Sequence, residues 1–192
     1  DSSAASDVYK RQIINNTIMK NFKIILVSTA FLLIFMSCQT KTVGYNTYEW
    51  AKDYKFSLGS DESIDIAMKF DKAWNDRDFE TMTELASDSI KFFFFNGIKR
   101  DFDFVKNAAA TQDSIREANG SSVEAEIKHV YSLVLNPNNG WEHVRSHIVY
   151  TSTDSLGNIN KWRQFERFAV KDGKVQRFAG SYQDIPEDTP EE

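Results

Sequence analysis

The sequence predicts an α+β fold in which three helices, interrupted by one phenylalanine-rich hairpin, pack in a curved, mostly antiparallel sheet. Residues 61–119 combine helical periodicity with turn residues and contain four successive phenylalanines at 92–95. Residues 123–182 form four β-type runs separated by turns, and they hold all three histidines and two of the four tryptophans. We therefore expect any ligand to contact the sheet that these four runs form.

An uncharged apolar run, residues 24–36, follows Lys20 and Lys23 and precedes Ser37 and Cys38. Its 13 residues fit the apolar core of a signal peptide and fall short of the roughly 20 that a membrane-spanning helix needs. A buried core helix is the alternative. The segment resembles a bacterial lipoprotein signal, which implies that Cys38 becomes the acylated first residue of a signal-free chain. The expected location is the cell envelope, facing the periplasm, with surface exposure left open.

Residues 1–18 precede a natural start at Met19, so the signal peptide is expected at 19–37. Residues 2–12 look like the in-frame translation of a transposase adapter from a sequencing library, and we leave residues 1–18 out of the fold. Without residues 1–37 the chain has 19 basic and 26 acidic side chains, a net charge of −7. This charge argues against nucleic acid as a partner and against electrostatic adhesion to anionic lipid. We therefore expect the protein to contact the membrane only through its lipid anchor.

Three helices are expected after a polar tether at residues 38–60 that packs partly onto the core. The first begins at Ser60 or Asp61, an N-cap followed by acids, and runs to Trp74. The second is short and ends near Ala86 to Asp88. The third covers residues 101–116 and closes at Asn119-Gly120.

Residues 89–95 predict a buried strand, and Asn96-Gly97 predicts the hairpin turn into a return strand at 98–100. The sheet continues with four strands at 123–135, 141–152, 159–170 and 175–182. The short turns between them imply antiparallel neighbours. Residues 185–192 contain four acids and two prolines and predict a disordered tail.

This order of elements resembles the NTF2-like superfamily, which includes the SnoaL-like and ketosteroid-isomerase-like cone folds. Residues 70–79 (FDKAWNDRDF), followed by Leu85, are similar to the family's opening segment, and residues 170–175 (VKDGKV) are similar to its closing hairpin. The resemblance covers residues 61–184 and implies one domain there. The superfold hosts isomerases, dehydratases, cyclases and plain binding modules. Relatives with ketosteroid isomerase activity carry a general-base carboxylate on the first strand, and residues 91–95 contain no acid.

The histidines are the strand residues whose charge changes near neutral pH. Alternation places His129 with Tyr131 and apolar residues on a face that we expect to point inward. His143 and His147 share a face with Trp141, which lines a pocket if it is concave and is solvated if it is convex. Four residues along a strand span about 13 Å, so this histidine pair cannot hold one metal ion, and no metal site is predicted.

Two acids are further candidates. Asp71 lies at the edge of the first helix's apolar stripe, where it is either solvated or turned toward a cavity. On the third long strand, Glu166 shares a face with Trp162 and Phe168. The opposite face of this strand consists of Arg163, Phe165 and Arg167. Glu166 either forms an acid–base couple with a histidine across the sheet or makes a structural cross-strand pair.

The favoured hypothesis is a lipid-anchored domain that binds a small, mostly apolar ligand or serves as an assembly module, with no demonstrated chemistry. The expected ligand contacts are Trp74, His129, Tyr131, Trp141, His143 and Trp162. The alternative is a general acid–base enzyme, an isomerase or dehydratase, that uses His129 with His143, Asp71 or Glu166. A third hypothesis is a homodimer paired through the sheet. No cofactor is predicted, because no dinucleotide, P-loop, zinc-protease or nucleophile-elbow motif occurs.

Overall fold

The structure is a computed structural model, which describes residues 41–94 and 97–186. The predicted adapter, the signal peptide, the lipidated Cys38 and the acidic tail beyond residue 186 lie outside the described residues. No helix in the described ranges is long and apolar enough to cross a membrane.

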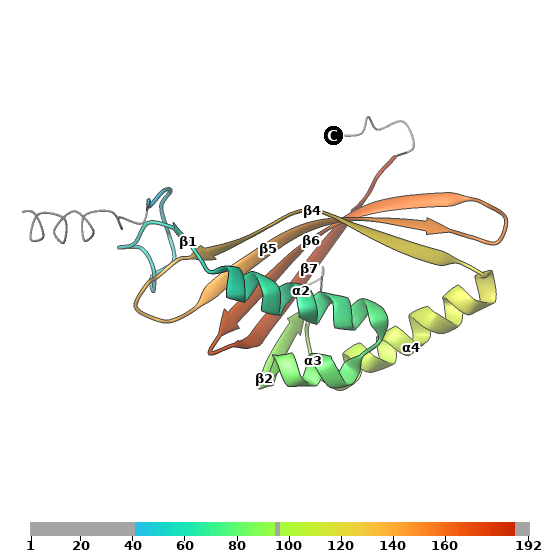
Figure 1. Cartoon of the computed structure of the whole chain (residues 1–192), viewed down its shortest axis with the longest axis horizontal. Helices are drawn as coiled ribbons and strands as arrows, with labels where there is room; N and C mark the ends of the chain where they lie inside the picture. The colour runs from blue at the N-terminus through green and yellow to red at the C-terminus, as the bar shows by residue number, and fades with distance from the viewer. Residues whose placement is uncertain (1–40, 95–96, 187–192) are drawn as a thin grey trace, which may run out of the picture. The chain divides into compact units, whose positions relative to one another are not determined.

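Seven strands form one sheet in the order β1-β4-β5-β6-β7-β2-β3. Their bounds are β1 (Ser57–Leu58), β2 (Ala86–Phe93), β3 (Lys99–Arg100), β4 (Ser122–Val134), β5 (Glu142–Thr153), β6 (Ile159–Lys171) and β7 (Lys174–Asp184). Strands β4 to β7 are antiparallel neighbours, whereas β2 joins β7 in parallel. Helices α2 (Asp61–Asp76), α3 (Phe79–Leu85) and α4 (Phe102–Asn119) lie on one side of this sheet (Figure 1). The predicted α+β fold, with three helices in a curved and mostly antiparallel sheet, is confirmed.

The helices begin and end at the residues that their capping chemistry requires. The side chain of Ser60 accepts a hydrogen bond from the backbone N–H of Ser63 at 3.1 Å, and α2 ends at Arg77 in the left-handed conformation. Helix α4 is capped by Asp101 and closes at Gly120, also left-handed. The second helix ends at Leu85, slightly earlier than expected, because the following residues already belong to β2.

A bulge in β4 decides which side chains reach the interior. Before it, Ile127 lies opposite Ile148 of β5, which points toward the helices. The register shifts between Ile127 and His129, so that His129 and Tyr131 point away from the helices and are exposed. The expected inward position of His129 is therefore wrong, because one extra residue reverses the alternation.

The core lies between the helices and the inner face of the sheet. Phe70 of α2 packs edge-on against Phe168 of β6, with ring centroids 6.3 Å apart, and it also stacks with Phe92 of β2. Among the described phenylalanines of the run, at 92–94, Phe92 is buried in this core and Phe94 packs against it. The neighbouring Phe93 points to the outer face, where the guanidinium of Arg177 covers its ring.

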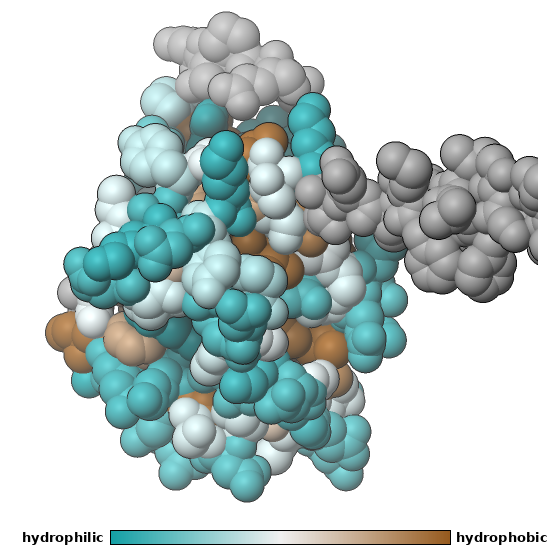
Figure 2. All heavy atoms as spheres, turned by 90° about the vertical axis from the view of Figure 1, so that its left-hand side faces the viewer, coloured by the Kyte–Doolittle hydropathy of each residue, from teal (hydrophilic) through white to brown (hydrophobic). Residues whose placement is uncertain are grey.

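The segment before α2 packs along the end of β4. Val43 and Phe56 pair as an isolated bridge, and the side-chain amide of Asn46 donates to the backbone oxygen of Leu135 at 3.1 Å. β1 then extends the sheet beside β4. Hydrophilic side chains cover most of the surface drawn in Figure 2, with apolar ones in small separate patches. Residues 41–60, predicted as part of a tether, thus make specific contacts with the sheet.

Candidate functional site

A cavity of about 220 Å³ lies between the helices and the inner face of the sheet. Most of its lining is aromatic or aliphatic, including Phe70, Trp74, Phe92, Tyr150, Trp162 and Phe178. A few polar side chains, such as Asp71, Asn75 and Arg116, interrupt this lining. An apolar cavity with few, localised polar groups is the usual form of a small-molecule site.

Asp71 is the acid in this lining, and only 7% of its surface is exposed. Its position one helical turn before Asn75 lets the Asn75 amide donate to Asp71 Oδ2 at 3.2 Å. The same amide donates to the backbone oxygen of Asp71 at 3.1 Å. The sequence left open whether Asp71 is solvated or turned toward a cavity, and the structure places it at the cavity.

Glu166 lies behind Asp71 on β6 and is 1% exposed. Ser146, its partner across the β5–β6 ladder, donates its hydroxyl to Glu166 Oε2 at 2.9 Å. Gln164, two residues before it on the same face, donates to Oε1 at 2.7 Å. The carboxyl groups of Asp71 and Glu166 also share a hydrogen bond. Two carboxyl groups can share a hydrogen bond only if one of them is protonated.

Burial determines which carboxyl holds that proton. It raises the pKa of Asp71 to about 6, an effect that the hydrogen bond from Glu166 partly offsets. Burial, and then the charge of Asp71, raise the pKa of Glu166 to about 8. At neutral pH the pair therefore carries one proton, held mainly by Glu166, and presents an Asp71 carboxylate to the cavity.

Tyr150 and Trp162 belong to the part of the cavity wall that the sheet provides. They are cross-strand partners on β5 and β6, and their rings stack at 5.2 Å with an interplanar angle of 7°. Burial, followed by the charges of Asp71 and Glu166, raises the pKa of Tyr150 well above its usual value. The side chain of Asn75 partly offsets this effect on the pKa of Tyr150. Tyr150 thus stays a neutral phenol and can donate a hydrogen bond.

The structure divides the predicted site residues between the two faces of the sheet. Asp71, Trp74 and Trp162 line the inner cavity, with Glu166 directly behind Asp71. Trp141 and His143 line a groove that includes outward-facing residues of the same strands. His129 and Tyr131 lie on the outer face with their rings 6.1 Å apart, in neither hollow.

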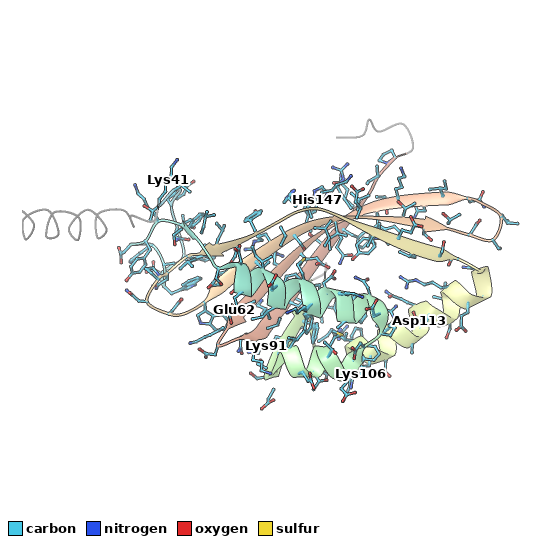
Figure 3. All side chains as sticks on the ribbon, in the orientation of Figure 1. Lys41, Glu62, Lys91, Lys106, Asp113 and His147 are labelled. Carbon is cyan, nitrogen blue, oxygen red and sulfur yellow. The ribbon has the colours of Figure 1, made fainter. Side chains whose placement is uncertain are left out.

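The proposed couple between Glu166 and a histidine is wrong. Glu166 points inward beside Ser146, whereas His143 and His147 alternate with Ser146 and point outward. Figure 3 shows His147 on the side of the sheet turned away from the helices. The sheet itself therefore separates the histidines from both acids.

Sequence reasoning missed the polar residues around the acid pair: Asn75, Ser146, Tyr150 and Gln164. A signal for two of them was present. Asn75 follows Asp71 at helical spacing, and Gln164 shares the face of Glu166 between aromatic residues. Ser146 and Tyr150 join them only through the pairing of β5 with β6.

No protein-family model matches the chain, and no curated protein matches it. Solved structures that it resembles include IdmH from Streptomyces antibioticus, a candidate polyketide cyclase, at 16% identity and a TM-score of 0.48 over 64% of this chain and 92% of that one. A ketosteroid isomerase-like protein from Erwinia carotovora atroseptica has 17% identity and a TM-score of 0.45 over 64% and 93%. An NTF2-like protein from Burkholderia xenovorans has 11% identity and a TM-score of 0.41 over 66% and 93%. The fold and the site define an α+β domain with a carboxyl pair at an internal apolar cavity.

Proposed function

We propose that the cavity binds a small, mostly apolar molecule whose one polar group either donates a hydrogen bond to the Asp71 carboxylate or accepts one from the Tyr150 hydroxyl. The observation that carries this proposal is the Asp71 carboxyl, hydrogen-bonded to Glu166, in an otherwise largely aromatic lining. An apolar cavity of about 150 Å³ takes up benzene, so 220 Å³ suits a ligand of roughly ten non-hydrogen atoms. Aromatic ketones and phenols have this size and polarity.

Proton transfer is the second function that we propose, because the pKa of Asp71 is raised to about 6. Such a carboxylate is ionised at neutral pH and is a stronger base than an ordinary aspartate. It would take a proton from the carbon next to a carbonyl, with the electron pair passing to the carbonyl oxygen, and return it to the same or another carbon. The neutral Tyr150 hydroxyl is the group in the lining suited to stabilise that oxygen. Return of the proton to carbon gives isomerisation, whereas delivery of the proton to a β-hydroxyl group that leaves as water, with formation of the C=C bond, gives dehydration.

Saturation-transfer NMR with acetophenone tests binding, and deuterium uptake at its methyl group in D₂O tests proton transfer. We expect wild-type protein to bind acetophenone and to accelerate the uptake. Asp71→Asn should abolish the acceleration, whereas Asp76→Asn, an exposed acid on the same helix, should leave it unchanged. Binding without accelerated uptake would exclude the enzymatic function and leave the binding function standing. Failure to bind any small ketone or phenol would refute both functions.

The envelope location is also proposed, on the basis of the apolar run 24–36 and the single cysteine that follows it. A lipid on Cys38 would hold the domain at the membrane, facing the periplasm. In a bacterial host expressing the chain from Met19, Cys38→Ala should move the protein from the membrane fraction to the soluble fraction, and Ser37→Ala should not. Unchanged partitioning of Cys38→Ala would refute the anchor.

A homodimer paired through the sheet stays a proposal, supported by exposed aromatic side chains on the outer face. Phe165 is 41% exposed there, and Tyr131 is 42% exposed. Sedimentation analysis should show dimers that Phe165→Asp dissociates. Phe104→Asp is the matched control, because Phe104 is equally exposed but lies on α4. A monomeric wild-type protein at high concentration would contradict the proposal.

A further inference from the structure

A second hollow, of about 560 Å³, lies on the outer face of the sheet. The strand register arranges its side chains in two rows across β5, β6, β7 and β2. One row consists of His143, Ala169, Arg177 and Lys91, and the next consists of Arg145, Arg167, Ala179 and Phe93. The two alanines form a low floor between longer basic side chains. Figure 3 labels Lys91, the outermost member of the first row, on β2.

The register places like charges directly opposite each other twice in this outer groove. Arg145 faces Arg167 across β5 and β6, and Arg177 faces Lys91 across β7 and β2. Opposed like charges destabilise a sheet. Burial, and then the charge of Arg167, lower the pKa of Arg145. Strand pairing thus holds four cations together at a cost to the fold.

No carboxylate within residues 41–94 and 97–186 forms an ion pair with any of these four cations. The lining of the outer groove also contains no acid, although the chain as a whole has a net charge of −5. The described part of the chain therefore leaves the repulsion uncompensated, and an anion bound in the groove would relieve it.

Aromatic rings border the same groove. Trp50 stacks on His143 with centroids 6.2 Å apart, and Trp141 also contributes to the lining. His143 Nε2 is buried and has no hydrogen-bond partner among the described residues. Burial, followed by the charges of Arg145 and Arg177, lowers the pKa of His143 to about 4, so its ring is neutral at pH 7. The groove thus combines a flat apolar border with a neutral ring nitrogen and cationic side chains on either side of the alanine floor.

We propose that the outer groove binds an aromatic phosphate monoester. Guanidinium groups from three adjacent strands can approach three phosphate oxygens from different directions, whereas a planar carboxylate offers only two oxygens. The aromatic part of the ligand lies against Trp50 and Trp141, and His143 Nε2 gains a polar partner. The groove of a second copy does not fit over this groove, because it would bring the same cations together; the dimer proposed above would use Phe165 and Tyr131, which do not line the groove. This site is independent of the function of the inner cavity.

Calorimetric titration with three probes tests the proposal: 1-naphthyl phosphate, inorganic phosphate and 1-naphthalenesulfonate. We expect 1-naphthyl phosphate to bind about tenfold more tightly than either of the others, because only this probe has both the double charge and the ring. Arg167→Gln should weaken its binding about tenfold or more. Arg100→Gln, which removes the same charge from β3 outside the groove, should leave the affinity unchanged.

Arg167→Gln should also raise the melting temperature of the ligand-free protein, because it removes one of two opposed charges. A loss of binding in a more stable variant cannot result from misfolding. The proposal is overturned if 1-naphthyl phosphate shows no saturable binding, or if inorganic phosphate binds equally well. It is also overturned if Arg100→Gln weakens binding as much as Arg167→Gln does, or if Arg167→Gln lowers the melting temperature.

Discussion

Gly180 and Ala179 are neighbours in β7, and they belong to opposite hollows of the molecule. Gly180 lines the inner cavity between the helices and the sheet, and Ala179 lines the outer groove. A Cβ atom on Gly180 would lie 3.4 Å from Phe178 Cζ, an ordinary contact, so a larger residue fits without backbone strain. One strand thus provides matched positions for closing each hollow separately.

Gly180→Val should fill the inner cavity and abolish acetophenone binding while leaving 1-naphthyl phosphate binding intact. Ala179→Val should have the converse effect, because its added methyl groups raise the floor of the outer groove. Acetophenone and 1-naphthyl phosphate are each titrated into Gly180→Val and into Ala179→Val. Each variant then serves as the control for the other. Loss of both ligands in either variant would contradict the separation of the two sites.

The acid pair should make the fold less stable as pH rises. Burial raises the pKa of Asp71 to about 6 and that of Glu166 to about 8, so the folded state binds protons more tightly than the unfolded state. Their stabilising contribution is complete below the ordinary carboxyl pKa of about 4 and is lost as pH rises to about 8. Urea unfolding of wild-type protein should show a free energy lower by a few kcal/mol at pH 9 than at pH 5.

Glu166→Gln tests this pH dependence, because an amide keeps the hydrogen-bonding shape without the charge. The variant should lose less stability than wild type between pH 5 and pH 9. Carboxyls with a lowered pKa, such as Asp78 and Asp113, contribute the opposite trend, but only as pH falls below about 4. An identical pH dependence in wild type and Glu166→Gln would show that Glu166 is not the group that titrates.

Arg77 joins the end of α2 to α4 near the cavity. Its Nε donates to Asp113 Oδ2 at 2.8 Å, its Nη2 donates to Oδ1 at 2.8 Å, and its guanidinium covers the ring of Trp74. Figure 3 shows Asp113 on α4 beside the corner that follows α2. Arg77 also has a positive φ of 62°, which costs a residue with a Cβ atom about 1 kcal/mol relative to glycine.

Arg77→Ala should therefore destabilise the protein more than Arg77→Gly, by about 1 kcal/mol in urea unfolding. Both variants lose the ion pair with Asp113, and only glycine relieves the backbone strain. Asp113→Asn measures the contribution of the charge alone, which at this partly exposed position is about 1 kcal/mol or less. Equal stability of the alanine and glycine variants would indicate that the left-handed conformation is not strained.

Local chemistry made much of the fold predictable. Ser60 and Gly120 mark helix ends through capping, and the turns between the long strands fix their antiparallel order. Alternation correctly grouped Trp162, Glu166 and Phe168 on one face of β6. Such signals involve residues close in sequence, where backbone geometry alone sets the outcome.

The candidate site was less predictable because it depends on pairing between distant segments. Alternation cannot reveal the bulge that turns His129 outward, and it cannot tell which face of the sheet the helices cover. The parallel pairing of β2 with β7 places Lys91 beside Arg177, although the two residues are far apart in the sequence. The contact of Asp71 with Glu166 likewise arises only when α2 packs on β6.

Asp71 and Glu166 share one proton at neutral pH, and carboxyl ¹³C NMR titration measures this directly. Asp71→Asn and Glu166→Gln assign the two resonances. We expect the pair to titrate in two steps above the ordinary carboxyl range, one at about 6 and one at about 8, with the upper step lost in Glu166→Gln. Titration of both carboxyls at about 4 would contradict it.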